Sequence, residues 1–293
     1  MDIVITYVCG EDPQWQDDYA RTLDVPPIEK RYRDMGTLKY LLRGIEKYMP
    51  SVERVFLAVS RDSQVPGWVN REEVHVVRHD EFIPGEYLPT FNSTAIEMFL
   101  HRIPSLGERF LYFNDDFFPV GPISEDDCFP GGRPRTGFST ILFSPTDYLK
   151  RCRNSDALSR KILGLSPSPL FVRPQHNCSP MLRSVNGKVF EMAREDILSS
   201  ITTVRSPRNI NQYLFLDYML HSGIAIRQRQ KAKFFSLGFR KAEDVASFIL
   251  DSGGVSLLCL NDAKMPPEKY LRSRDVLLEA FQRKFPQKSR FEV

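Results

Sequence analysis

The 293-residue chain lacks the short motifs that mark several large enzyme classes. It contains no GxxxxGK[ST] loop, GxGxxG fingerprint, GxSxG elbow or HExxH pair. These absences argue against P-loop ATPases, ordinary NAD enzymes, α/β-hydrolases and zincins. Its five cysteines show no CxxC spacing, so they favour reduced thiols over disulfides or a zinc site.

Long apolar runs and a strong net charge are also missing. The apolar runs are strand-length, far short of the roughly 20 residues that a membrane-spanning helix needs. The net charge of +3 comes without a long run of one sign and argues against a nucleic-acid partner. This small basic excess suits an anionic substrate or an anionic membrane surface, and it does not choose between them. Residues 1–5 lack the basic and apolar regions of a signal peptide, so we expect a cytoplasmic location.

Strand and helix patterns alternate along the first 116 residues. Apolar, β-branched runs predict strands at 2–8, 55–59, 74–77 and 109–113, and helical periodicity predicts helices at 36–48 and 94–103. This alternation predicts an α/β fold with a Rossmann-like, mostly parallel sheet and helices on both faces. The C-terminal part reads as mainly helical, apart from a strand-like run at 255–260.

The segment from about residue 119 to 174 breaks this pattern with Gly, Pro and Ser clusters and one expected helix near 154–163. Long irregular segments in compact enzymes are often functional. We therefore expect an insertion or lid here, within a single catalytic domain that spans residues 1–293.

Two adjacent carboxylates, Asp115 and Asp116, directly follow an aromatic-rich strand. Keeping both ionised is costly unless a cation lies beside them, and oxygen ligands of this kind select Mg²⁺ or Mn²⁺. The alternative is that Asn114, Asp115 and Asp116 only form a turn. Asp262, after the last strand-like run, offers a further metal ligand or a second turn.

Three more residues are candidates for acid–base chemistry and phosphate binding. Glu97 fits a general base, but it also fits the capping box of a helix that starts near Thr94. His176 lies in a loop, where it is either presented to a site as acid or base or simply solvated. Arg205 precedes an expected helix, so its guanidinium and the free amides of that helix would suit phosphate oxygens.

Four stretches of the chain resemble, in order, the motifs of the Stealth family. That family includes bacterial capsular polysaccharide phosphotransferases and the animal N-acetylglucosamine-1-phosphotransferase. The resemblance covers nearly the whole chain and is most specific in its second stretch. The stretches are residues 2–13, 31–70 with 88–116, 176–185 with 205–223, and 259–262 with 285–292.

The resemblance implies an enzyme that moves a hexose-1-phosphate or N-acetylhexosamine-1-phosphate from a UDP-sugar to a sugar hydroxyl and releases UMP. It implies Mg²⁺, or Mn²⁺ in its place, an oligosaccharide or polysaccharide acceptor, and peripheral association with membrane-bound capsule machinery. It also favours catalysis over capping for Glu97. The implied site has catalytic Glu97, Asp116, His176 and Arg205, substrate-binding Gly10, Asp12, Arg33, Asn92 and Asn114, and metal ligands Asp115, Asp116 and Asp262.

Three positions depart from the family pattern and bear on donor or acceptor preference. They are Cys9 in the first motif, Met35 after Arg33-Asp34, and Asn209 after the Arg-Ser-Pro motif. Two other functions stay open. One is a metal-dependent glycosyltransferase that releases UDP, and the other is a catalytically silent sugar-binding protein of a capsule complex.

Overall fold

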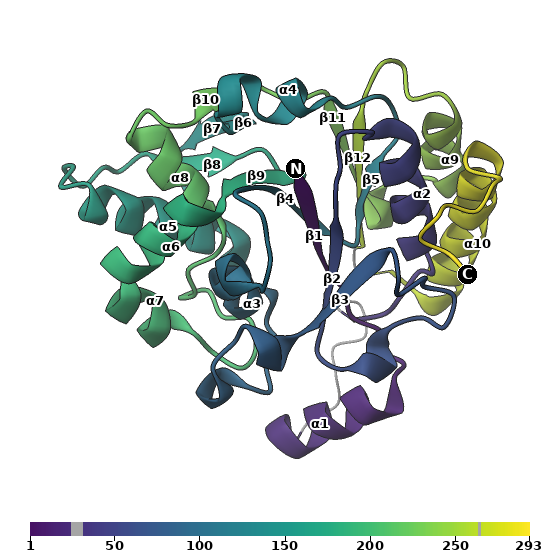
Figure 1. Ribbon diagram of the computed structural model, residues 1–293, viewed down its shortest axis with the longest axis horizontal. Helices are drawn as coiled ribbons and strands as arrows, with labels where there is room; N and C mark the ends of the chain where they lie inside the picture. The colour runs from purple at the N-terminus through teal and green to yellow at the C-terminus, as the bar shows by residue number, and fades with distance from the viewer. Residues whose placement is uncertain (25–31, 263–264) are drawn as a thin grey trace.

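The central sheet has five strands: β1 (Asp2–Thr6), β2 (Val55–Val59), β3 (Val74–Arg78), β4 (Arg109–Asn114) and β9 (Ser179–Leu182). The computed structural model describes residues 1–24, 32–262 and 265–293. The strand order is β3-β2-β1-β4-β9, with the first four parallel and β9 antiparallel to β4 (Figure 1). A 3-2-1-4 order of parallel strands is that of Rossmann-like folds, so the predicted α/β class is confirmed.

Side chains of β1 alternate between the two faces of this sheet. Ile3 and Ile5 lie in one apolar core and Val4 lies in a second core on the opposite face, as the two-residue period of a strand requires. The first core is covered by α2 (Leu38–Tyr48), α9 (Ala242–Leu250) and α10 (Pro267–Lys284). The second is covered by α3 (Ser93–Phe99), α5 (Asp147–Ile162), α6 (Arg183–Met192), α7 (Arg194–Ser200) and α8 (Tyr213–His221). Figure 1 shows these groups on opposite sides of the sheet, which confirms the predicted helices on both faces.

A second sheet continues from the end of β4. It consists of β5 (Phe117–Pro119), β12 (Leu257–Asn261) and β11 (Ala232–Ser236), with β11 parallel and β5 antiparallel to β12. Because β4 ends at Asn114 and β5 begins at Phe117, the pair Asp115 and Asp116 forms the junction between the two sheets. The amide of Leu260 donates to the carbonyl of Asp116 at 2.9 Å, which fixes this junction against β12.

The segment from 119 to 174 is more regular than its Gly, Pro and Ser clusters predict. It contains α4 (Glu125–Cys128), β6 (Arg135–Thr136), β7 (Phe138–Ile141), α5 and β8 (Phe171–Pro174). β7 pairs antiparallel with β8, and β6 pairs with β10 (Ile226–Arg227). The helix expected near 154–163 is the second half of α5, whose buried face carries Cys152, Ser155 and Ser159 and so lacks an apolar period. The role of this segment as an insertion or lid stays a prediction.

The described part of the chain holds no helix with the length and apolar character needed to cross a membrane.

Candidate active site

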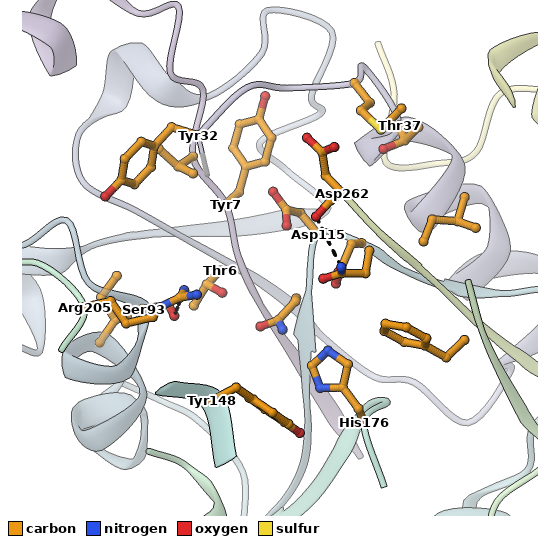
Figure 2. Close-up of a pocket in the computed structure, with 18 of the residues that line it drawn as sticks. Thr6, Tyr7, Tyr32, Thr37, Ser93, Asp115, Tyr148, His176, Arg205 and Asp262 are labelled. Carbon is orange, nitrogen blue, oxygen red and sulfur yellow. Dashed lines mark hydrogen bonds between the residues drawn. The ribbon is translucent and has the colours of Figure 1, made fainter. Parts of the chain in front are cut away.

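A cleft of about 870 Å³ opens at the carboxyl ends of β1, β4 and β12 (Figure 2). This edge is where open α/β sheets place their ligands. The cleft brings together seven of the predicted site residues from segments far apart in the sequence: Arg33, Asn114, Asp115, Asp116, His176, Arg205 and Asp262.

The acidic pair at the β4–β5 junction is partly buried and short of partners. One oxygen of Asp116, Oδ2, accepts a weak bond from the Cys259 thiol at 3.6 Å, and the buried Oδ1 has no partner among the described residues. Burial and the charge of Asp116 raise the pKa of Asp115 to about 8, and burial raises the pKa of Asp116 to about 6. Carboxylates placed in this way are stabilised by a nearby cation.

The residues present fit a divalent metal ion through Asp115 and Asp116. Their hard oxygen donors suit Mg²⁺ or Mn²⁺. Ligand atoms of His176 and Cys259 lie within 4.8 Å of an Asp116 oxygen and of each other, so softer donors are also close to this carboxylate.

Asp262, the third predicted metal ligand, is engaged by a cation of the protein itself. Its two oxygens accept from Nε and Nη2 of Arg33 at 2.5 and 2.7 Å. The Arg33 guanidinium also stacks over the Tyr270 ring at 3.8 Å, and the Tyr270 hydroxyl donates to the carbonyl of Asp34 at 3.1 Å. The Arg33–Asp262 ion pair thus joins the loop at Asp34 to the end of β12. A metal ion would have to compete with Arg33 for the Asp262 carboxylate.

Glu97 lies behind the cleft wall. Ser93 and Ile96 of the same helix line the cleft, whereas Glu97 is buried and its Oε2 accepts the Gln212 amide at 3.0 Å. Burial raises its pKa. A capping box that includes Glu97 would need Thr94 as the N-cap of α3. The N-cap is Asn92 instead, so the capping-box interpretation is wrong.

Arg205 reaches the cleft from the loop between α7 and α8. Its Nη2 donates to the Ser93 hydroxyl at 2.6 Å, as Figure 2 shows. The prediction that helix amides assist Arg205 is wrong. α8 begins only at Tyr213, and the amides of Gln212 and Tyr213 already donate to Glu97 Oε2 and Asn211 Oδ1.

His176 is held in the cleft by a chain of hydroxyl groups. Its Nδ1 is 3.0 Å from the Tyr213 hydroxyl, which is 3.1 Å from the Tyr148 hydroxyl. Burial and then the charges of Arg173 and Arg205 lower the His176 pKa to about 4. The imidazole is therefore neutral at pH 7. Its other nitrogen, Nε2, is not part of this chain of hydroxyl groups and can accept a proton.

Three predicted substrate-binding residues shape the surroundings of the cleft but do not line it. A side chain at Gly10 would bring its Cβ within 2.5 Å of the Tyr32 carbonyl oxygen. Asp12 caps α1 (Pro13–Leu23) and accepts from Gln64 Nε2 at 2.7 Å. Asn92 is fully buried, caps α3 and donates to the carbonyl of Thr202 at 2.9 Å.

Two groups of cleft residues escaped the sequence analysis. The first is an aromatic wall of Tyr7, Trp15 and Tyr32, in which the Trp15 and Tyr32 ring centroids lie 4.8 Å apart. The second is a set of basic residues: Arg151, Arg173, Arg229 and Lys233. No local motif surrounds these four basic residues. They reach the cleft only because α5, β8 and the segment around β11 pack around it.

Comparison with known proteins decides the family. Residues 31–134 match the model of the Stealth protein conserved region 2. A receptor polysaccharide phosphotransferase of Streptococcus oralis is 31% identical over 100% of this chain and 99% of its own. The chain belongs to the Stealth family. A capsular polysaccharide phosphotransferase of Streptococcus pneumoniae is 29% identical over 100% of this chain and 99% of its own.

Membership in the Stealth family confirms the predicted resemblance and the prediction of a transferase enzyme. A solved structure of a galactosyltransferase with donor and acceptor sugar analogues covers 95% of this chain and 96% of its own at a TM-score of 0.43 and 11% identity. That likeness is too remote to carry an argument.

Proposed function

We propose that this Stealth protein transfers a sugar 1-phosphate from a UDP-sugar to a hydroxyl of an oligosaccharide or polysaccharide. The product is a phosphodiester linkage in a capsular or cell-surface polysaccharide, and the released nucleotide is UMP. The observation that carries the proposal is one cleft in which the Asp115–Asp116 pair, Arg205 and a neutral His176 come together. The full-length similarity to polysaccharide phosphotransferases supports the same reaction class.

The donor fits along the cleft from the aromatic wall to the acidic pair. Tyr7, Trp15 and Tyr32 line this end of the cleft and would contact a uracil through their ring edges. Asp115 and Asp116 would hold Mg²⁺, which neutralises charge on the diphosphate when bound. Arg205, oriented by its bond to Ser93, is placed to donate to phosphoryl oxygens.

His176 suits the role of general base better than Glu97. The imidazole lines the cleft, whereas Glu97 sits behind Ser93 with one oxygen bonded to the Gln212 amide. In the proposed step the acceptor oxygen bonds to the phosphorus next to the donor sugar and its proton passes to His176. The bond from that phosphorus to the bridging oxygen breaks, and UMP leaves with the electron pair. We assign Glu97 a positioning role at the start of α8.

The proposal includes a cytoplasmic location with peripheral attachment to a membrane. The loop after β7 supports the membrane attachment, because Leu142 and Phe143 are 44% and 75% exposed and Arg153 donates to the Leu142 carbonyl. An apolar tip beside a cation suits an anionic lipid surface. Co-sedimentation with anionic vesicles, compared between wild type and Phe143→Ser, tests this attachment.

The nucleotide product tests the reaction. The protein is incubated with Mg²⁺, a panel of UDP-sugars and oligosaccharide acceptors, and the released nucleotide and the product linkage are identified. UMP with a phosphodiester product supports the proposal, whereas UDP with a glycosidic product refutes it. Donor binding without turnover on any acceptor would instead indicate a silent sugar-binding protein.

A further inference from the structure

Four basic side chains line the cleft without an acidic partner. Arg151, Arg173, Arg229 and Lys233 make no ion pair or hydrogen bond through their charged groups with any residue in the described ranges. The other arginines of the cleft differ, because Arg33 is paired with Asp262 and Arg205 donates to a serine hydroxyl. No carboxylate of the described residues contacts any of these four charged groups directly.

Arg151 is the most telling member of this group. It is only 7% exposed, and it projects from α5 to the cleft. Burial and the nearby charge of Arg205 lower its pKa, while Glu97 opposes that change. The Arg151 guanidinium faces the cleft and makes no hydrogen bond with a described residue, so a bound anion at this position would stabilise it.

Arg229 is exposed, and the backbone of its neighbour Gln230 is fixed by Gln175. The Gln175 side chain donates from Nε2 to the Gln230 carbonyl and accepts from the Gln230 amide through Oε1, both at 3.1 Å. A Cβ at Gly137 would lie 2.7 Å from Cγ of Arg229, so the missing side chain leaves room for the arginine stem. These contacts fix the backbone beside Arg229 and leave room for its stem next to the stretch that leads into His176.

The basic group lies on the side of the cleft away from the proposed nucleoside position. In Figure 2, Tyr7 and Tyr32 lie on one side and Tyr148 and His176 on the other, with Asp115 between them. Arg151 lies on α5 together with Tyr148, and Arg173 lies on β8, which leads into His176. A donor with its base at the aromatic wall and its diphosphate at the acidic pair leaves this side to the acceptor.

We propose that Arg151, Arg173, Arg229 and Lys233 form a phosphate subsite for the acceptor, and that the acceptor is a glycan carrying a phosphate near the attacked hydroxyl. This inference rests on the proposed function and narrows its substrate class. A phosphodiester made in one round would supply the anion that the subsite binds in the next, so the arrangement favours repeated transfer onto one growing chain.

Steady-state kinetics with a matched acceptor pair tests the subsite. The pair is a phosphodiester-bearing oligosaccharide and the same oligosaccharide without its phosphate. Wild type should show about a tenfold lower KM for the phosphate-bearing acceptor, since each charge-assisted hydrogen bond is worth roughly that factor or more. Arg173→Gln and Arg229→Gln should each raise that KM about tenfold and leave the donor KM and the neutral acceptor KM unchanged. Lys231→Gln, an exposed change near Arg229 but outside the cleft lining, should behave as wild type.

Inorganic phosphate serves as an independent probe. It should inhibit wild type competitively with the phosphate-bearing acceptor and not with the donor, and the inhibition should weaken in Arg173→Gln. A rise in donor KM in either variant would show that these arginines bind the donor. An equal rise in KM for both acceptors would show that the acceptor phosphate is not recognised. Either result overturns the subsite. Release of UDP would refute the proposed reaction instead, while the ratio between the two acceptors would still report on the subsite.

Discussion

Asp116→Asn should abolish transfer and, in the metal-free protein, make the fold more stable. Burial raises the Asp116 pKa from 3.8 to about 6. At 1.36 kcal/mol for each pKa unit, ionised Asp116 destabilises the fold by about 3 kcal/mol. Asparagine removes that cost together with the carboxylate that a metal ion needs.

The size of this effect depends on pH. Because the pKa of Asp116 is raised in the folded protein, wild type loses stability as pH rises from about 4 to about 6. The advantage of Asp116→Asn should therefore be absent at pH 4 and reach about 3 kcal/mol at pH 8. For a chain of this size we expect a rise in Tm of about 5 °C at pH 8.

Thermal unfolding in EDTA at both pH values measures the effect. Asp126→Asn, an exposed change in α4, is the matched control and should stay within about 0.5 kcal/mol of wild type. Adding Mn²⁺ or Mg²⁺ should raise the Tm of wild type and not that of Asp116→Asn. An Asp116→Asn protein that melts at or below wild type at pH 8 would refute the electrostatic reasoning, and wild-type turnover in it would refute the metal assignment.

Three further predictions concern other buried polar groups. Glu292→Gln should lower the free energy of unfolding by about 3–5 kcal/mol in urea titrations, because Arg43, which bonds both Glu292 oxygens at 2.7 Å, would lose its buried counter-charge. Asp217→Asn should raise stability more at pH 8 than at pH 4, because burial raises the Asp217 pKa and both of its oxygens lack a partner in the described structure. His176→Ala should lower kcat by at least about 100-fold, and Tyr213→Phe by about fivefold with the donor KM unchanged, since one neutral hydrogen bond to the base is worth about 1 kcal/mol.

Each of these three predictions has a control variant. Glu279→Gln, exposed on α10, should unfold with wild type, and equal midpoints for it and Glu292→Gln would contradict the buried pair. Asp126→Asn again controls for Asp217→Asn, and a gain that does not depend on pH would exclude ionisation as its cause. Tyr218→Phe, also on α8, should keep full activity, so an equal loss in both tyrosine variants would indicate damage to α8 rather than to the base.

The sequence predicted the parallel part of the sheet well because buried strands carry continuous apolar, β-branched runs. β2 begins and ends at the predicted residues, 55 and 59. α5 and β11 were harder. α5 buries small and polar side chains, and β11 carries the exposed Lys233 and Phe234, so neither shows a simple hydrophobic period. Their positions follow from packing against elements distant in the sequence.

The candidate site was predictable where strand ends dictate it. The end of β4 placed Asp115 and Asp116 in the cleft, since the carboxyl ends of parallel strands share one edge. The pairing of Asp262 with Arg33 joins residues 229 positions apart, and no local pattern announces it. The inward turn of Glu97 likewise depends on the Gln212 amide, which only the folded chain brings close.

The Arg43–Glu292 pair makes the order of synthesis matter for folding. Arg43 lies on α2, beside the first strands of the sheet, but its counter-charge lies 249 positions later in the sequence. The backbone repeats this dependence, since the Asn70 amide donates to the carbonyl of Phe291 at 2.8 Å. In a nascent N-terminal half, the Arg43 guanidinium has no counter-charge from Glu292. The region around α2 cannot reach its final packing until residues 291 and 292 have left the ribosome. The final packing of α2 therefore forms only after residue 292 has been translated.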